Sequence, residues 1–200
     1  MADSRFLIAV TPEIPVEDEG RKIESLLRAG WHRVHLRHPH ATRTEMRSLI
    51  ESISQDYHGR IVLHGHFDLI CDFNLGGLHL NRRCPTPPVL YNGPLSCSCH
   101  SVDEIEAVDN MEYVTLSPIF DSISKTGYKS NFSAESLIHL DKCTTPVVAL
   151  GGIAPEHFKT LKCFHFNGYA MLGAIPWNAT CLQVEEFAAY CIANADLSNN

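Results

Sequence analysis

Short apolar runs alternate with amphipathic segments along most of the chain. Each run is four to six residues long, which is typical of a buried strand. Most of the runs are followed by a segment in which apolar positions have helical spacing, and this alternation favours a parallel sheet. The runs cover residues 5–10, 34–37, 61–64, 77–80, 95–99, 113–116, 147–150 and 168–172.

The clearest helix pattern lies between the second and third runs. Apolar residues from Met46 to Ile53 fall at i, i+3, i+4 and i+7, so they share one helical face. Thr42 and Glu45 have the spacing of a capping box at the start of this helix. A last helix is expected at about residues 181–193, whereas the third and fourth runs leave room only for a short helical link.

Eight strands with intervening helices, no linker and no change of composition predict one (β/α)8 TIM barrel domain over residues 1–200. At 200 residues this α/β barrel has minimal length. An open doubly wound sheet is the alternative, but eight regular repeats favour the closed form. The active site of such a barrel lies at the carboxyl ends of the strands.

Composition and charge narrow the functional classes. The chain is 44% hydrophobic and 20% charged, and its net charge of −7 argues against nucleic-acid binding. No apolar stretch approaches the roughly 18 residues of a membrane span, and the first residues show no signal-peptide pattern. Eight cysteines without such a signal indicate reduced thiols, so we expect a cytoplasmic protein.

Basic residues and glycines follow several strands. Arg37 ends the second strand and suits either an anion or a salt bridge at the rim. Lys125 lies in a long polar loop and either closes over an anion or is a solvated lysine. Gly151 and Gly152 follow the seventh strand and Gly173 follows the eighth. Such positions often hold a phosphate, although glycines there also make tight turns.

The stretch LSCSCH at residues 95–100 resembles a metal site at first sight. Side chains of a strand alternate between its two faces, which puts Ser96, Ser98 and His100 on one face. The cysteines at 97 and 99 then lie on the other face, where cysteine packs as a small hydrophobe. We therefore expect no metal here. His79 shares a face with Gly77 and is expected to be a hydrogen-bonded residue inside the barrel.

Four stretches resemble the thiamine-phosphate synthase/TenI family when taken in order. They read SCSCHS, EYVTLSPIFDSISKTGY, PVVALGGI and GYAMLGAI, and the resemblance extends from about Phe6 to Ile175. It implies a (β/α)8 barrel that binds a thiazole phosphate, with Thr-x-Thr-Lys receiving pyrophosphate in the synthases. The matching residues are Arg37, Ser98, His100, Ser122, Ser124, Lys125, Gly151, Gly152 and Gly173.

The chain departs from the synthase pattern where the family binds Mg²⁺. The synthases carry Asn-Asp after the third strand, and this chain has His64-Gly65. A second aspartate matches a position near Cys84, and Pro39 replaces a basic residue. Mg²⁺ prefers carboxylate oxygens, so these changes argue against a magnesium site. Glycine in place of the first aspartate is the pattern of the TenI branch, which the chain therefore resembles most.

The resemblance therefore implies thiamine biosynthesis, and a metal-independent thiazole tautomerase is the first hypothesis. His100 would be its acid/base group, Ser98 and Lys125 would be further catalytic residues, and His64 would contact substrate. The alternatives are a thiamine-phosphate synthase, which joins hydroxymethylpyrimidine pyrophosphate to thiazole phosphate and uses Mg²⁺, and an inert thiazole or thiamine phosphate binder. The expected partner is a small molecule, with no nucleic acid or membrane, and a homo-oligomer is left open.

Overall fold

The computed structural model describes residues 6–120 and 132–195. Three predicted site residues, Ser122, Ser124 and Lys125, lie outside the described residues. Their assignment to a pyrophosphate loop therefore stays a prediction.

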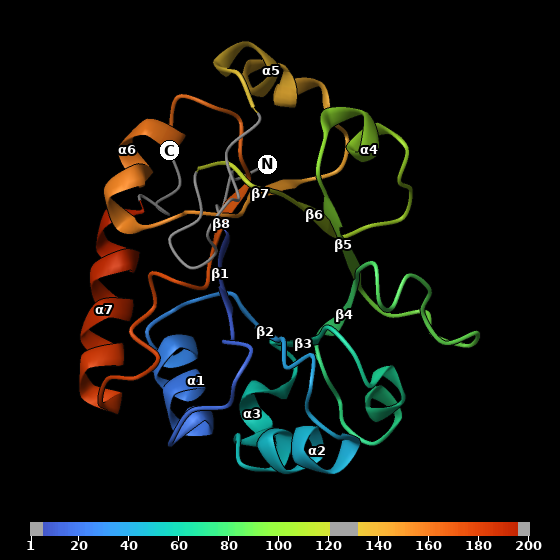
Figure 1. Ribbon diagram of the computed structural model, residues 1–200, viewed down its shortest axis with the longest axis vertical. Coiled ribbons are helices and arrows are strands. Elements are labelled where there is room, and N and C mark those ends of the chain that lie inside the picture. Colours follow the sequence, from blue (N-terminus) through green and yellow to red (C-terminus); the bar gives the residue numbers. More distant parts are fainter. Residues whose placement is uncertain (1–5, 121–131, 196–200) are drawn as a thin grey trace.

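Eight parallel strands close into one barrel in chain order, as Figure 1 shows along the barrel axis. The last strand pairs with the first, with Ile8 opposite Ala170, so the sheet has no free edge. The predicted (β/α)8 barrel is confirmed and the open sheet is wrong. The strands are β1 (Phe6–Val10), β2 (Arg33–Leu36), β3 (Ile61–Leu63), β4 (Gly77–Leu80), β5 (Leu95–Cys99), β6 (Tyr113–Leu116), β7 (Val147–Ala149) and β8 (Gly168–Met171).

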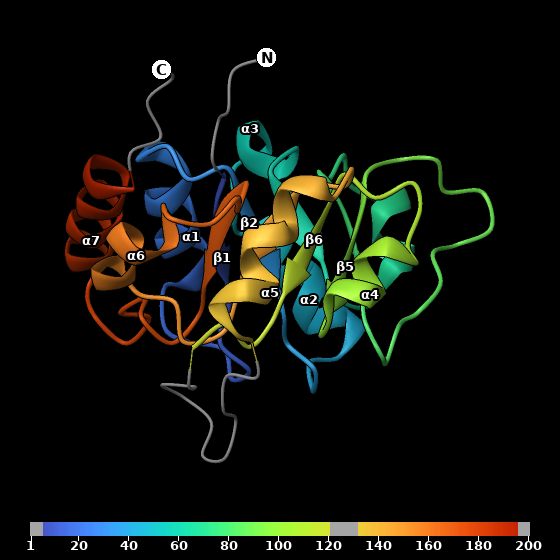
Figure 2. The same ribbon diagram turned by 90° about the horizontal axis from the view of Figure 1, so that it is seen from above.

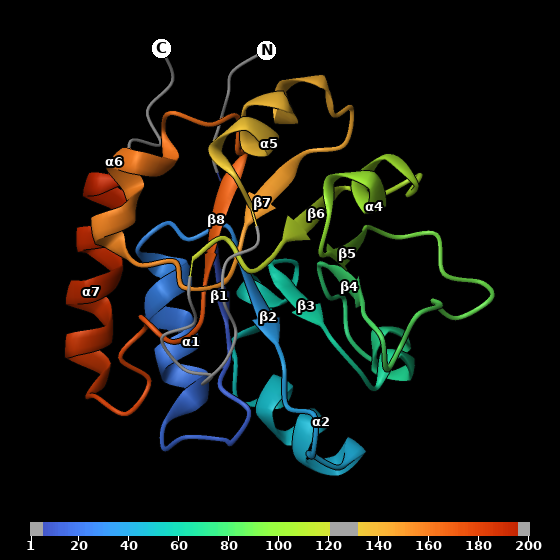
Figure 3. The same ribbon diagram turned by 45° about the horizontal axis from the view of Figure 1, so that its top comes forward.

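Helices surround the strands on the outside of the barrel (Figure 3). Within the described residues, no helix is both long and apolar enough to cross a membrane. The α-helices are α1 (Glu19–Arg28), α2 (Arg43–Glu51), α3 (Gln55–His58), α4 (Val102–Glu106), α5 (Ala134–Ile138), α6 (Phe158–Leu161) and α7 (Cys181–Asn194), and the 3-10 helices are η1 (Phe67–Cys71), η2 (His139–Lys142) and η3 (Pro155–His157).

The helix after β2 forms as the sequence predicts. Thr42 Oγ1 accepts a hydrogen bond from the backbone N–H of Glu45, and Glu45 Oε2 accepts one from the N–H of Thr42 at 2.7 Å. This capping box starts α2, which buries Met46 and Ile50 against the barrel.

Residues 81–94 depart from the repeating pattern, because β4 and β5 are joined without a helix. The segment carries an isolated bridge between Asn81 and Cys84 and then extends outward, as seen in Figures 1 and 2. Asn81 holds the start of this segment against the barrel, since its side-chain amide donates to the carbonyls of His64 and His79. One side of the barrel mouth is therefore built by an irregular segment.

The interior of the barrel is apolar on one side and polar on the other. Ile8, Val148 and Ala170 pack together from β1, β7 and β8. On the opposite side, His35 and His79 point inward from β2 and β4, and each is 1% exposed. Barrels of this type are usually filled with branched aliphatic side chains. Buried polar groups cost stability unless they are hydrogen-bonded, so this polar half calls for a functional explanation.

Candidate active site

A cavity of about 1490 Å³ opens at the carboxyl ends of the strands. Every predicted site residue that the structure describes lines this cavity. They are Arg37, His64, Ser98, His100, Gly151, Gly152 and Gly173. Residues separated by more than a hundred positions in the sequence thus meet at one site, as the barrel rule requires.

The glycine pair after β7 adopts backbone conformations that favour glycine. Gly151 has φ 90° and Gly152 has φ 64°, both in the left-handed region. A Cβ at Gly151 would lie 2.7 Å from Pro118 Cα, so close packing already requires glycine there. The tight turn is present, and phosphate binding at Gly151, Gly152 and Gly173 stays a prediction.

Arg37 makes the rim salt bridge that the sequence left open. Its guanidinium lies 2.8 Å from Glu13 Oε1, and its backbone N–H donates to Thr11 Oγ1 at 2.8 Å. Both partners come from the β1–α1 connection, which fixes the arginine at the cavity edge. A role in anion binding stays a prediction. The guanidinium of Arg37 would then have to contact the anion as well as the carboxylate of Glu13.

His100 is held at the cavity mouth by two hydrogen bonds. Its backbone N–H donates to Glu104 Oε2 at 2.6 Å, and its ring Nδ1 lies 3.0 Å from the carbonyl oxygen of Ser117. A carbonyl only accepts, so Nδ1 carries the proton. In the neutral ring Nε2 is then the basic nitrogen, as a general base needs.

Cys97 and Cys99 are both buried in the main core cluster. The prediction that the cysteines of β5 face away from the pocket is wrong for Cys97, which lines the cavity, whereas Cys99 is not among the lining residues. A hydrogen bond with Cys97, together with burial, raises the pKa of the Cys99 thiol. The two thiols are therefore packing residues, and no group of three metal-ligating side chains in the described residues includes either of them.

His79 holds both inward serines of β5. Its Nδ1 lies 2.8 Å from Ser96 Oγ and its Nε2 lies 2.9 Å from Ser98 Oγ, which confirms the hydrogen-bonded histidine inside the barrel. Ser98 is therefore engaged by His79. A catalytic role for Ser98 stays a prediction. In that role Ser98 would act while its hydroxyl is hydrogen-bonded to His79.

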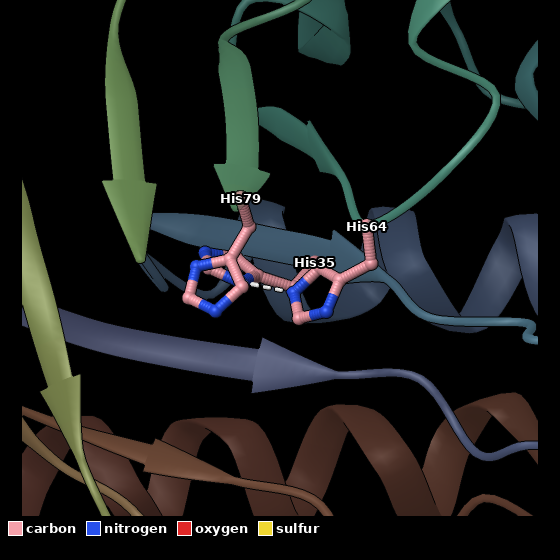
Figure 4. A group of neighbouring side chains, drawn as sticks. All are labelled: His35, His64 and His79. Atoms are coloured by element: carbon pink, nitrogen blue, oxygen red, sulfur yellow. Dashed lines mark hydrogen bonds between the residues drawn. The ribbon is translucent and has the colours of Figure 1, made fainter. Parts of the chain in front are cut away.

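Three histidines meet at the floor of the cavity (Figure 4). His35 Nδ1 lies 2.8 Å from His64 Nε2, and His35 Nε2 lies 2.5 Å from the hydroxyl of Tyr113. The rings of His64 and His79 stack with their centroids 4.2 Å apart. Burial lowers the pKa of His79 to about 3 and holds those of His35 and His64 well below 6.5. All three rings are therefore neutral at physiological pH.

This cluster was not predicted, although the sequence contained a signal for it. VHLR, IVLH and GLHL each place a histidine near the carboxyl end of consecutive strands. The inward face of His35 follows from its sharing a face with Arg37. Consecutive strands of a barrel are neighbours, so the three histidines lie on adjacent strands, and the register between the strands decides that they meet.

The cavity does not fit the magnesium site of the synthases. Gly65 and a position near Cys84 match the carboxylates of that pattern, and no Asp or Glu occurs among the described residues that line the cavity. Mg²⁺ prefers oxygen ligands, and a thiol or imidazole is a poor substitute. The described residues therefore offer Mg²⁺ no carboxylate cage.

Comparison with known proteins identifies the family. The family model described as thiamine monophosphate synthase matches residues 7–175. This chain belongs to that family. The match spans all eight strands apart from the first residue of β1, so the family expected from the sequence is confirmed.

Relatives within this family carry synthase names. The chain is 26% identical over 161 residues to a putative thiamine-phosphate synthase 2 of Aquifex aeolicus (strain VF5), which covers 76% of this chain and 85% of that protein. It is 25% identical to a thiamine-phosphate synthase of Clostridioides difficile (strain 630), over 85% of this chain and 86% of the relative. A thiamine phosphate pyrophosphorylase structure from Bacteroides thetaiotaomicron is 35% identical with a TM-score of 0.81, over 98% of this chain and 100% of that one.

Proposed function

We propose that this protein is a thiamine-phosphate synthase that joins a pyrimidine pyrophosphate to a thiazole phosphate in the cavity at the strand ends. The names of its relatives support this reaction, which the sequence analysis placed second, better than they support the tautomerase. The reaction belongs to thiamine biosynthesis, and both substrates are small anions.

The observation that carries the proposal is the charge of the cavity wall. Arg82 and Arg83 line it together with Arg37, which is paired with Glu13, and no acidic residue lines the cavity within the described residues. The chain as a whole has a net charge of −7, so this concentration of positive charge is local. A cleft of one sign attracts ligands of the opposite sign, as a phosphate and a pyrophosphate require.

In the synthase reaction charge is separated between the pyrimidine carbon and the leaving pyrophosphate, and no proton is transferred. The bond between the pyrimidine methylene carbon and the pyrophosphate oxygen breaks, and pyrophosphate leaves with the electron pair. The thiazole nitrogen uses its lone pair to bond to that carbon, giving thiamine phosphate. Guanidinium groups bind pyrophosphate oxygens in a bidentate manner, so Arg82 and Arg83 are the described residues suited to stabilise the leaving group.

Thiazole tautomerisation is the second candidate function, and His100 favours it. A tautomerase moves a proton on the bound thiazole, and His100 presents a basic Nε2 at the cavity mouth because Nδ1 is held by Ser117. This reaction also needs no metal, in keeping with the lack of carboxylates in the described lining.

A paired assay separates the two candidates. The purified protein is given pyrimidine pyrophosphate with thiazole phosphate, and separately the thiazole carboxylate phosphate tautomer, each with and without Mg²⁺. Formation of thiamine phosphate with equimolar pyrophosphate supports the synthase. Tautomer conversion alone would replace it with the second candidate, and binding without turnover would identify an inert binder.

A further inference from the structure

We propose that His35, His64 and His79 bind a divalent transition-metal ion of the zinc class at the floor of the cavity. The three rings come from β2, β4 and the end of β3, and they face one another in Figure 4. This site is independent of which reaction the protein catalyses. It revises our expectation from the sequence that the protein has no metal site.

The nitrogen atoms are close to the spacing that a metal ion needs. One ring nitrogen from each histidine lies within 4.8 Å of the other two. Zinc–nitrogen bonds of about 2.0–2.1 Å in a tetrahedral site set the nitrogens about 3.3 Å apart. The His35–His64 pair, now 2.8 Å apart, would open by about half an ångström on binding. The rings of His64 and His79 are stacked, so binding also requires these two rings to rotate until their nitrogens converge on the ion.

The protonation state of the cluster suits a metal. A histidine ligand must be neutral, and the buried position keeps all three rings uncharged. Imidazole nitrogens suit zinc, copper, iron and nickel, whereas Mg²⁺ and Ca²⁺ prefer oxygen. The same donors that make the cavity a poor magnesium site therefore favour an ion of this other class.

Neighbouring side chains are placed to orient the ligands. A metal-bound histidine usually donates its second ring N–H to a nearby acceptor. The Tyr113 hydroxyl lies 2.5 Å from His35 Nε2, which leaves Nδ1 for the ion. Ser96 Oγ lies 2.8 Å from His79 Nδ1 and holds that side of the ring, so Nε2 is the nitrogen for the ion, and an ion there would replace the hydrogen bond that Nε2 now makes with Ser98 Oγ. Both arrangements involve buried residues of the barrel interior.

The site has an open side and an unsatisfied polar group beside it. All three histidines line the cavity, so a fourth ligand can reach the ion from there, as in catalytic zinc sites with three protein ligands. Thr115 is 2% exposed and lines the same cavity, and its hydroxyl has no hydrogen-bond partner among the described residues. In the pairing of β5 with β6, Thr115 lies opposite Ser98, whose hydroxyl is hydrogen-bonded to His79. A water or anion on the metal would lie within this polar pocket.

Metal binding to the full-length protein tests the proposal. After removal of metals with a chelator, Zn²⁺ is titrated by calorimetry and Co²⁺ is titrated by visible absorption. We expect one ion per chain and a cobalt spectrum without the strong thiolate charge-transfer band. The cobalt spectrum matters because the described residues include eight free cysteines. An ion bound to cysteine sulfur would show the thiolate band, and an ion bound to the histidines would not.

Two variants and a control locate the ion. His64→Gln should weaken Zn²⁺ binding more than tenfold, and Tyr113→Phe should weaken it about 10–100-fold by freeing His35. His66→Gln is the matched control, because His66 lines the same cavity but donates to the Ala41 carbonyl outside the cluster. Wild-type protein without a stoichiometric site, a thiolate spectrum, or equal affinities in all variants would overturn the proposal.

Discussion

The neutral histidines at the cavity floor make the metal-free protein sensitive to acid. Lowering the pH from about 7.5 to about 5 in the presence of a chelator should therefore lower the stability of the folded protein. In the unfolded chain His79 titrates near 6.5, and in the folded protein its pKa is about 3. Between these two pH values His79 is protonated in the unfolded chain and neutral in the folded protein. The free energy of unfolding is therefore greatest above pH 6.5 and falls as the pH drops toward 3.

The magnitude follows from the size of that window. Each pH unit below 6.5 costs about 1.4 kcal/mol per group, so His79 alone should lower the free energy of unfolding by about 2 kcal/mol at about pH 5. Burial shifts the pKa values of His35 and His64 in the same direction, so the loss for the whole cluster should be larger. Urea unfolding at a series of pH values measures it.

Variants assign the effect to the cluster. His79→Gln keeps a side chain that can hydrogen-bond Ser96, but it removes the titrating ring. Its stability should therefore fall less between pH 7.5 and pH 5 than that of the wild type. His139→Gln removes an exposed histidine and is the control. If His79→Gln and the wild type lose stability in parallel over this range, the buried neutral imidazole is not the cause.

Three further predictions concern the cavity and its wall. His100→Asn should lower any tautomerase rate by about 10²–10⁴-fold with little change in thiazole phosphate affinity; a near-wild-type rate would remove the second candidate function. Cys99→Ala should lower the free energy of unfolding by about 1 kcal/mol in urea titrations without changing turnover, since Cys99 is buried in the outer core; a lost rate with intact stability would contradict its packing role. Synthase turnover should not rise across a Mg²⁺ titration, because the described lining has no carboxylates; strong dependence would mean that ligands lie elsewhere.

The barrel was predictable because parallel strands covered on both faces appear in a sequence as short apolar runs. The predicted last helix at residues 181–193 matches α7 within a residue. The conformation of the helix-free segment between β4 and β5 was not predictable, since residues 81–94 have neither a helical nor a strand-like pattern of apolar positions. Such segments are shaped by contacts, here the hydrogen bonds from Asn81 to the strand ends.

The site was predictable in its position but not in its contacts. Arg37 was placed at the cavity edge by the barrel rule, yet its pairing with Glu13 depends on how the β1–α1 connection folds back. The histidine cluster was missed because each histidine was considered on its own strand. Its existence depends on the register of the adjacent strands β2, β3 and β4, which brings His35, His64 and His79 together.

Calorimetric titration of thiazole phosphate into two variants tests whether the cavity binds the phosphate of a thiazole beside Gly152. Gly152→Asn and Gly152→Asp impose similar strain at φ 64°, because both residues tolerate the left-handed region, but only the second adds a negative charge. Repulsion between that charge and a dianionic phosphate about 5 Å away costs about 1.7 kcal/mol in a water-like dielectric. We predict that Gly152→Asp binds thiazole phosphate at least tenfold more weakly than Gly152→Asn. Equal affinities would contradict the phosphate site.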